Sequence, residues 1–429
     1  MSGFQKLNIE PSLIQALEEQ RITRPTEIQE RLIPAILNKN DVIGQSQTGT
    51  GKTLAFALPV LSNIEVNKNE LQAVVVAPTR ELAEQIYRVM RTLAERVGEI
   101  RVQRAIGGTD KDRAIERLKR VPHILISTPG RLHDLVRQEH AVSVHHVSTL
   151  IIDEADQMLD MGFINEIDQV AGQMPDDLQM LVFSATIPEQ LRPFLKKYMQ
   201  APKHVHVKPD TPSPKGLTHY LIPLKSRSRE MLTIEMAKAL NPYLCLVFVN
   251  TKKEADSLTR LFIEHGIDTE TLHGDLSPRE RKQAMKKINR ADVPFVVCTD
   301  LAARGMDIEG VSHVVNVSIP RELEYFQHRA GRTARADLSG EVYTIVDKED
   351  YPALHKLQQQ RFFFHYVDLK HGEWKEIEQL GSGYAPGKVR TKSTSSKSSS
   401  PTRTPNKKQK NIKPGYKKKM KEEARRRRG

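Results

Sequence analysis

Cysteine and aromatic residues are both scarce in this sequence. Its 429 residues include two cysteines, Cys245 and Cys298, and only 5% of them are Phe, Tyr or Trp. Both cysteines stand within short apolar runs, so we expect small core residues in a reducing, cytoplasmic environment, without a disulfide framework or a zinc site. The low aromatic content also argues against a sheet that stacks nucleic-acid bases on a row of exposed rings.

Long apolar runs are missing as well. Residues 1–10 contain no apolar stretch after a basic cluster, so no signal peptide is expected there. Apolar stretches elsewhere fall well short of the roughly 18 residues that a membrane span needs. With 38% hydrophobic and 28% charged residues, we expect a globular cytoplasmic protein without a membrane partner.

Positive charge is abundant, but it is concentrated at one end of the chain. The net charge is +13, and residues 388–429 carry 17 Lys or Arg against Glu422 and Glu423, a net of +15 that leaves −2 for residues 1–387. Beyond Leu380 the chain turns to Gly, Ser, Thr, Pro and Lys, with few apolar residues to bury. This composition predicts a disordered basic tail.

Short apolar runs alternate with helical patterns in two series. Runs this short and rich in Val and Ile predict strands that are buried on both faces. The runs are 73–76, 124–126, 150–152 and 180–183 in the first series, and 244–249, 295–298 and 313–317 in the second. Residues 81–97 place their apolar side chains on one helical face. The alternation predicts an α/β fold with two parallel sheets.

The length of the chain predicts two domains, and proline marks the seam between them. Three prolines within 207–215 predict an extended linker. We expect a first domain over 1–207, a linker over 208–217, a second domain over 218–368, a short extension over 369–387 and the tail over 388–429. The three phenylalanines at 362–364 are interpreted as core rather than as a binding platform.

A glycine-rich loop with the sequence SQTGTGKT lies at residues 46–53, between a predicted strand and a helix. Such a turn directs backbone N–H groups and the positive end of the helix at a phosphate. Lys52 is expected to reach the β- and γ-phosphates and Thr53 to bind Mg²⁺. The loop residues expected to cradle the nucleotide are Gln47, Thr48, Gly49, Thr50 and Gly51.

Two charged clusters complete the chemical signal. Asp153, Glu154 and Asp156 follow the predicted strand at 150–152. A carboxylate there can hold Mg²⁺ and a second one can orient water, although acidic residues after a strand also cap helices. In the other domain, His328 begins a segment with Arg329, Arg332 and Arg335 at helical i,i+3 spacing, which predicts guanidinium groups projecting from one surface toward a phosphoryl group.

The ordered series of motifs resembles the DEAD-box RNA helicase family across nearly all of residues 1–365, and most closely its bacterial cold-shock members. Besides the clusters above, the matching elements are 24–29 with Phe4 upstream, 78–82, 107–108, 128–131, 184–186, 247–250, 273–275 and 299–307. The resemblance implies two tandem RecA-like domains and an RNA-stimulated ATPase that uses ATP and Mg²⁺ to clamp, bend and locally unwind RNA.

The resemblance also implies a role for each matching residue. Phe4 would stack on the adenine, Gln29 would bind its edge, and Asp307 would meet the ribose. Thr26 would also belong to the nucleotide site. Lys52, Thr53 and Asp153 would hold the phosphates and Mg²⁺, Glu154 would handle the water, and Arg332 and Arg335 would touch the γ-phosphate. The RNA-binding residues would be Pro78, Thr79, Arg80, Gly107, Gly108, Thr128, Pro129, Gly130, Arg131, Gly274 and Thr299. Hydrolysis would be coupled to unwinding by Asp156, Ser184, Thr186, His328 and Arg329.

Three positions depart from the family pattern. Ser46 replaces the usual Ala of the phosphate loop, Ala334 replaces a common Gly among the arginines, and Pro278 stands where Gln is usual, which removes one RNA contact. An ATP-switched RNA clamp, a DNA-translocating helicase and a P-loop ATPase without nucleic acid remain as alternatives. The sequence leaves open the RNA substrate, the role in cold adaptation, ribosome assembly or RNA turnover, the partners from those pathways and the oligomeric state.

Overall fold

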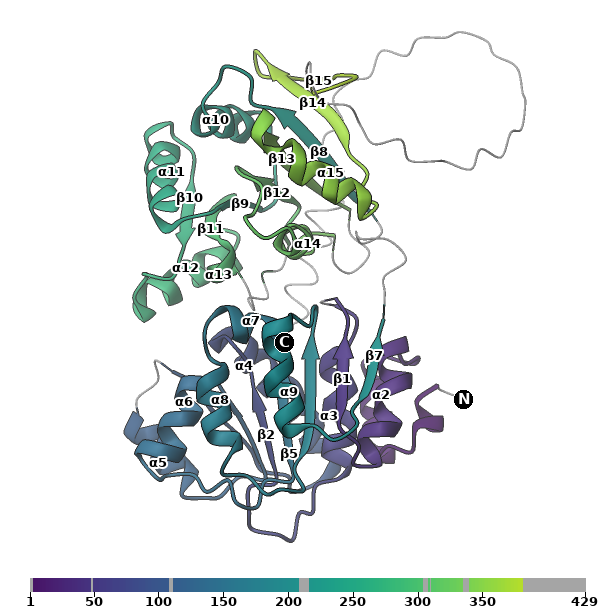
Figure 1. Ribbon diagram of the computed structural model, residues 1–429. Coiled ribbons are helices and arrows are strands. Elements are labelled where there is room, and N and C mark those ends of the chain that lie inside the picture. The colour runs from purple at the N-terminus through teal and green to yellow at the C-terminus, as the bar shows by residue number, and fades with distance from the viewer. Residues whose placement is uncertain are drawn as a thin grey trace, which may run out of the picture. The chain divides into compact units, whose positions relative to one another are not determined.

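The computed structural model describes residues 3–47, 49–107, 111–207, 216–303, 308, 310–334 and 339–380. These residues form two compact units, here called unit 1 (3–207) and unit 2 (216–380). Each unit is built on its own sheet with helices around it (Figure 1). No helix in the described part of the chain is long and apolar enough to cross a membrane.

Unit 1 contains a parallel seven-stranded sheet in the order β3-β4-β2-β5-β6-β1-β7. Its strands are β1 (Val42–Gln45), β2 (Ala73–Val76), β3 (Val102–Ala105), β4 (Ile124–Ser127), β5 (Thr149–Asp153), β6 (Gln179–Ser184) and β7 (Lys203–His206). Its α-helices are α1 (Pro11–Glu19), α2 (Glu27–Leu37), α3 (Lys52–Ser62), α4 (Arg80–Val97), α5 (Lys111–Leu118), α6 (Pro129–His133), α7 (Ala155–Asp160), α8 (Ile164–Ala171) and α9 (Arg192–Tyr198). Single turns lie at Gly3–Leu7, Asp134–Gln138 and Glu189–Leu191.

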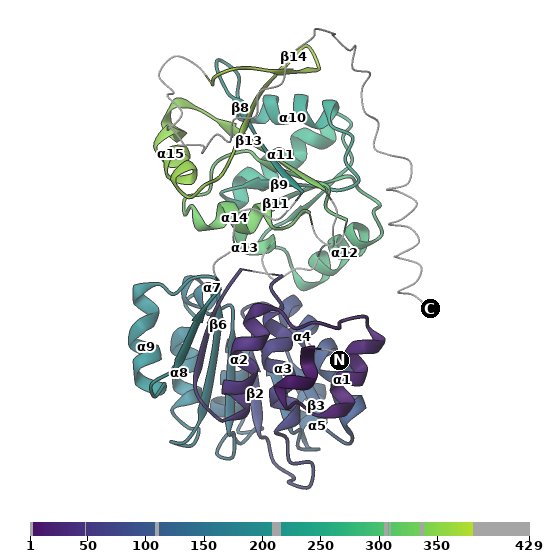
Figure 2. The same cartoon turned by 90° about the vertical axis from the view of Figure 1, so that its right-hand side faces the viewer.

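Both faces of this sheet are buried, as the short apolar runs predicted. Along β2, Val75 belongs to one core cluster, whereas Val74 and Val76 belong to another. Helices lie on both sides of the sheet in Figures 1 and 2. Side chains alternate between the faces of a strand, so a strand covered on both sides needs an unbroken apolar run.

Unit 2 contains an eight-stranded sheet in the order β10-β11-β9-β12-β13-β8-β14-β15, parallel except for the pair β14 and β15. Its strands are β8 (Leu217–Pro223), β9 (Cys245–Val249), β10 (Thr269–Leu272), β11 (Phe295–Thr299), β12 (His313–Asn316), β13 (Gly340–Val346), β14 (His365–Lys370) and β15 (Glu373–Glu376). Its helices are α10 (Arg229–Ala239), α11 (Lys252–Glu264), α12 (Pro278–Asn289), α13 (Asp300–Ala303), α14 (Glu324–Ala330) and α15 (Tyr351–Gln359), with a turn at Lys348–Asp350.

Every strand predicted from the sequence is present, and the predicted helix 81–97 is α4. The interpretation of the cysteines as core residues is also confirmed, because Cys245 on β9 and Cys298 on β11 are free and fully buried. Of the three phenylalanines at 362–364, Phe362 is buried, whereas the middle one, Phe363, is 65% exposed.

The second sheet continues past Asp368, where we predicted that the second domain ends. Asp368 lies inside β14, and β15 pairs with that strand beyond it. The Asp368 side chain is 1% exposed and bonds Lys225 at 2.5 Å and Arg227 at 2.7 Å. Burial raises the pKa of Asp368, but the hydrogen bonds from these two cations outweigh it, and the pKa is lowered. A charged edge strand such as β15 is mostly solvated, so it lacks the apolar run that marks a buried strand.

Candidate nucleotide and RNA site

The loops that carry the predicted site residues of unit 1 meet at one edge of its sheet. All seven strands are parallel, so the carboxyl ends of the strands lie at the same edge. Along that edge the order of the sheet places Gly107 after β3, Thr128 after β4, Thr79 after β2, Asp153 at the end of β5 and Ser184 at the end of β6. The phosphate loop follows β1 next to β6. Predicted RNA residues therefore occupy one half of the edge and predicted nucleotide residues the other.

The glycine-rich loop turns directly into α3, as expected for a phosphate site. Gly49 and Gly51 have φ angles of 85° and 90°, in the left-handed region that favours glycine. Thr50 Oγ1 donates to the carbonyl of Gln47 at 2.9 Å and lies 2.8 Å from Ser46 Oγ. Ser46, where the family usually has Ala, thus joins the hydrogen bonds of the loop. Thr53 lies in the first turn of α3, and Thr48 lies outside the described residues.

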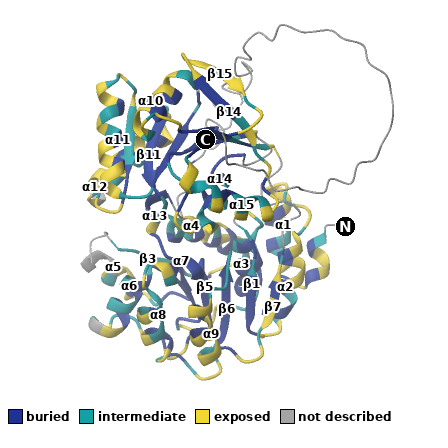
Figure 3. Ribbon diagram, turned by 45° about the horizontal axis from the view of Figure 1, so that its top comes forward, coloured by how far each residue is buried: buried dark blue, intermediate teal, exposed yellow. Residues whose placement is uncertain are grey.

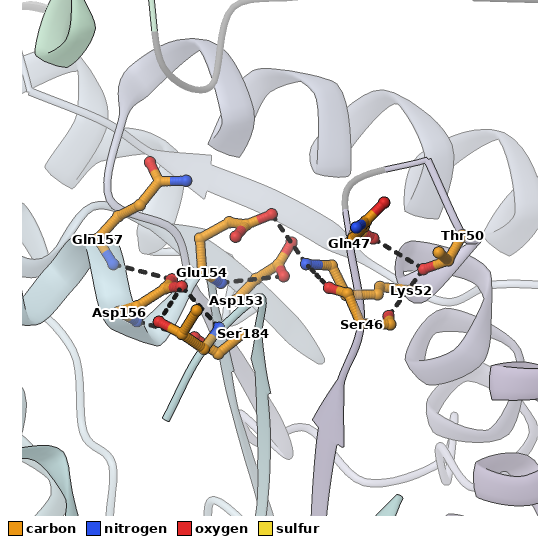
Figure 4. Close-up of polar contacts among 10 residues, drawn as sticks. Ser46, Gln47, Thr50, Lys52, Asp153, Glu154, Asp156, Gln157 and Ser184 are labelled. Atoms are coloured by element: carbon orange, nitrogen blue, oxygen red, sulfur yellow. Dashed lines mark hydrogen bonds and ion pairs between the residues drawn. The ribbon is translucent and has the colours of Figure 1, made fainter. Parts of the chain in front are cut away.

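Lys52 forms a buried ion pair with Glu154 across 102 residues of sequence (Figure 4). Its Nζ lies 3.0 Å from Glu154 Oε1 and donates to the carbonyl of Ser46 at 3.2 Å. Burial lowers the pKa of Lys52, but the carboxylates of Glu154 and Asp153 outweigh it, and the pKa is raised. Lys52 is therefore a cation at neutral pH, held at the mouth of the loop.

Asp153 is buried beside this pair and is short of neutralising charge. Burial and the charge of Glu154 raise its pKa to about 7, despite the nearby Lys52. Glu154 has left-handed backbone angles, φ 55° and ψ 53°, and its Oε2 is buried without a hydrogen-bond partner in the described part of the chain. A buried carboxylate oxygen without a partner, next to a carboxyl group whose pKa is raised, suits a nearby cation, so these residues fit Mg²⁺.

Asp156 ties the acidic loop to the strand beside it. Its Oδ2 accepts from the backbone N–H of Thr186 at 2.9 Å and from the Thr186 hydroxyl at 3.1 Å. In return, the backbone N–H of Asp156 donates to Ser184 Oγ at 3.0 Å. Figure 4 shows Asp156 and Ser184 beside the acidic residues. Through these hydrogen bonds, a shift of the loop after Asp153 would also move the end of β6.

Gln29 connects α2 to the phosphate loop. Its Oε1 accepts from the backbone N–H of Thr26 at 2.9 Å, which closes the capping box of α2. Its Nε2 donates to the carbonyl of Gly51 at 3.0 Å. The prediction for Phe4 is corrected, because this ring is 0% exposed in the hydrophobic core and has no face on which an adenine could stack. The aromatic position upstream of α2 serves packing here.

The residues predicted to bind RNA in unit 1 line neighbouring loops. Thr79 caps α4 by accepting from the backbone N–H of Leu82 at 3.2 Å, and exposed Arg80 follows it. A Cβ on Gly107 would lie 3.3 Å from Arg80 Nη2, so this guanidinium group rests against the glycine. The remaining residues are buried Pro78, then half-buried Thr128, buried Pro129, and half-buried Gly130 and Arg131 at the start of α6, while Gly108 lies outside the described residues.

In unit 2, Arg329 and Arg332 do not share one helical face, which corrects our prediction. Helix α14 ends at Ala330, so Arg332 lies in the turn beyond it. Arg329 is 1% exposed and points inward, where its guanidinium group contacts both carboxylate oxygens of Asp300 at 2.6 and 2.7 Å. It also donates to Asn250 Oδ1 at 3.0 Å. A buried guanidinium group needs this many acceptors to offset its lost hydration.

From the sequence we assigned no role to three of the residues that bond Arg329. Two of them lie in segments that match the helicase motifs. Asn250 follows β9, Asp300 follows β11, and Asn316 ends β12 with its Oδ1 3.3 Å from Arg329. Polar residues directly after buried strands were the available signal. The sequence did not show that they share Arg329 as a partner, because Arg329 lies on a helix later in the chain.

Other predicted residues of unit 2 lie at the carboxyl ends of its strands. Gly274 is exposed after β10, and Thr299 ends β11 with 7% exposure. His328 stacks on Tyr325 with ring centroids 6.2 Å apart. Arg332 is 8% exposed, whereas Asp307 and Arg335 lie outside the described residues.

Comparison with known proteins matches both units to helicase models. The DEAD/DEAH box helicase model matches residues 26–194, and the helicase conserved C-terminal domain matches residues 228–337. The chain is 48% identical over 419 residues to the DEAD-box ATP-dependent RNA helicase CshB of Bacillus subtilis (strain 168), covering 97% of this chain and 94% of that protein. It is 37% identical to the ATP-dependent RNA helicase CshA of Limosilactobacillus reuteri, over 83% of this chain and 71% of that one.

Solved structures agree with the architecture. S. cerevisiae Dbp5 bound to RNA and ADP BeF3 is 28% identical with a TM-score of 0.75, over 86% of this chain and 96% of that one. Mss116p bound to ssRNA and AMP-PNP has a TM-score of 0.70 at 24% identity, over 83% and 76% of the two chains, a likeness that bears on the fold alone. The predicted pair of RecA-like domains is thereby confirmed.

Proposed function

Because the chain belongs to the DEAD-box family of ATP-dependent RNA helicases, we propose that it hydrolyses ATP to clamp, bend and locally unwind RNA duplexes without sequence specificity. One observation carries the proposal. The buried cluster of Lys52, Asp153 and Glu154 shares a sheet edge with Thr79, Gly107 and Thr128. Asp156 bonds Ser184 and Thr186 at the end of β6, which lies between β5 and β1.

The nucleotide end of this edge has a role for each side chain. Lys52 binds the β- and γ-phosphates and gives up its contact with Glu154. The backbone N–H groups of residues 47–51 donate hydrogen bonds to the remaining phosphate oxygens. Thr53 and Asp153 would hold Mg²⁺, which when bound supplies charge neutralisation for the phosphates. Glu154, released from Lys52, orients the attacking water. Gln29 reads the adenine edge from its place beside Gly51.

The cations that would add to Lys52 are proposed to come from unit 2. We infer that Arg332 and Arg335 meet the γ-phosphate and that Asp307 meets the ribose. An arginine finger is worth roughly 10³–10⁵ in rate, so hydrolysis stays slow until RNA brings the two units together. Arg329 is a positioning residue, because its buried hydrogen bonds hold the segments at the ends of β9, β11 and β12.

RNA is held by its sugar–phosphate backbone. The predicted contacts in unit 1 are threonines, glycines, prolines and two arginines, a set of short and cationic side chains that suits phosphates rather than base edges. A bent strand does not fit an A-form duplex, so its complement is released. Location in the cytoplasm and partners in ribosome assembly or RNA decay stay predictions.

Glu154→Gln tests this function. The variant should bind ATP and RNA but release phosphate at least about 100-fold more slowly, since general-base help contributes roughly 10²–10⁴ in rate. Its RNA complex should dissociate slowly, and wild-type protein should unwind a short RNA duplex only with ATP. Stimulation of wild-type ATP hydrolysis by DNA as strongly as by RNA, or wild-type turnover by the variant, would contradict the proposal.

A further inference from the structure

Helix α12 of unit 2 has a basic face that the site described above does not use. Residues 278–290 include six Lys or Arg and one acidic residue, Glu280, in a part of the chain (residues 1–387) whose net charge is only −2. Figure 3 colours residues along α11 and α12 as exposed. Like charges on a single helix repel one another and destabilise it, so it matters which of these cations are paired and which face solvent.

The basic side chains of α12 fall into two sets. Arg281 donates to the carbonyl of Ala302 at 3.2 Å, and Lys287 pairs with Glu270 at 2.7 Å, so both are used within the unit. The other four are exposed and form no ion pair with any residue that the structure describes. These four, here called the α12 stripe, are Arg279, Lys282, Lys286 and Arg290.

The α12 stripe lies on one side of the helix. Its members are spaced by three, four and four residues, which places them in a row along the axis. The opposite side carries Ala284 and Ile288, which are 4% and 2% exposed. Packing therefore fixes how α12 is turned and directs the stripe to solvent.

The position of α12 connects the stripe to the predicted RNA site. Strands β10 and β11 are parallel, with Leu272 opposite Cys298, so Gly274 and Thr299 follow at the same edge of the sheet. Helix α12 starts a few residues after Gly274 and runs back toward the amino end of β11. The stripe thus begins at that edge and leads away from it for about 16 Å, at ~1.5 Å per residue.

We propose that the α12 stripe is an additional RNA-binding surface, which holds the sugar–phosphate backbone of RNA that continues beyond the residues at the sheet edge. This inference rests on the proposed function, since it extends the RNA site of unit 2. A row of exposed cations without aromatic side chains suits phosphates and reads no sequence.

The test uses the full chain with all four stripe residues changed to Gln, which keeps helix propensity. RNA affinity is measured over a salt series with two probes: a short single strand that only spans the core site, and the same strand extended on both sides. The stripe variant should keep its affinity for the short strand. For the extended strand, the slope of log K against log salt should fall in magnitude by about 3, at ~0.7 for each phosphate that is no longer bound.

A matched control removes the same charge elsewhere. Changing exposed Lys238, Lys253, Lys348 and Lys356 of unit 2 to Gln should leave both slopes nearly unchanged. An equal loss in this control, or no loss in the stripe variant, overturns the proposal; the stripe is then a solvated face or a site for an acidic protein. Binding of the short strand by wild type and its stimulation of ATP hydrolysis report on the proposed function separately.

Discussion

Single side chains in this protein hold several segments together. Gln29 closes the cap of its own helix with one amide atom and bonds the phosphate loop with the other. Arg329 bonds residues at the carboxyl ends of three different strands. Substitution of such a side chain should be strongly destabilising, because it leaves more than one hydrogen-bond partner unsatisfied.

Gln29→Ala should weaken ATP binding by about tenfold and GTP binding by less. The amide still has one N–H and one lone pair for the adenine edge, and each lost hydrogen bond is worth ~1 kcal/mol. Titration with both nucleotides measures this. Gln29→Glu, which keeps the acceptor for Thr26 and loses the donor for Gly51, serves as the comparison. Equal losses for ATP and GTP would make Gln29 a purely structural residue.

Arg329→Ala should lower the free energy of unfolding by about 3–5 kcal/mol, because it leaves the Asp300 carboxylate without its cation. Denaturant melts followed by far-UV circular dichroism measure the change. Substitution of the exposed Arg260 of α11 by Ala is the control and should stay within ~0.5 kcal/mol of wild type. A loss below about 1 kcal/mol for Arg329→Ala would show that the network contributes little.

The junction of α2, the phosphate loop and α3 works as one element. The two loop glycines have similar left-handed angles but different surroundings. A Cβ on Gly51 would lie 2.4 Å from Gln29 Nε2 and 3.2 Å from Thr26 Oγ1, whereas one on Gly49 would meet nothing within 4 Å. The absence of a side chain at Gly51 lets Gln29 of α2 contact the phosphate loop directly.

Gly51→Ala should therefore reduce ATP affinity far more than Gly49→Ala. Both variants carry the left-handed strain of roughly 1–2 kcal/mol, but only Gly51→Ala displaces the Gln29 amide. We expect at least about a tenfold difference in Kd between them, measured by calorimetry. Similar affinities would mean that strain alone decides and that the contact with Gln29 is dispensable.

The whole molecule joins a nearly neutral core, at −2, to a tail of +15. The tail, residues 388–429, lies outside the described residues, so its role rests on charge alone. A basic segment tethered to a weakly charged core raises the local concentration of RNA without reading bases.

Deleting residues 388–429 should weaken RNA binding uniformly across sequences and leave basal ATP hydrolysis almost unchanged. For single-stranded RNA, the magnitude of the salt slope should fall by about 0.7 for every phosphate that the tail no longer binds. Binding over a salt series, with several unrelated RNA sequences, measures both effects. If the truncated and full chains share one affinity and one slope, the tail does not tether RNA.

Local features of the sequence predicted much of this protein. The apolar runs predicted the strands, because a strand buried on both faces leaves its mark in consecutive residues. The glycine-rich loop predicted its own turn before α3, since φ angles of 85° and 90° favour glycine wherever they occur. These properties depend on neighbours along the chain.

Partners and burial were decided only by the tertiary structure. Lys52 meets Glu154 across 102 residues, and Arg329 turns inward to Asp300 although its spacing predicted an outward face. Phe4 became core, and the strand pair at 365–376 extended the second sheet. Spacing along a helix shows which side chains share a face, but whether that face meets solvent or a buried carboxylate depends on the residues that folding brings against it.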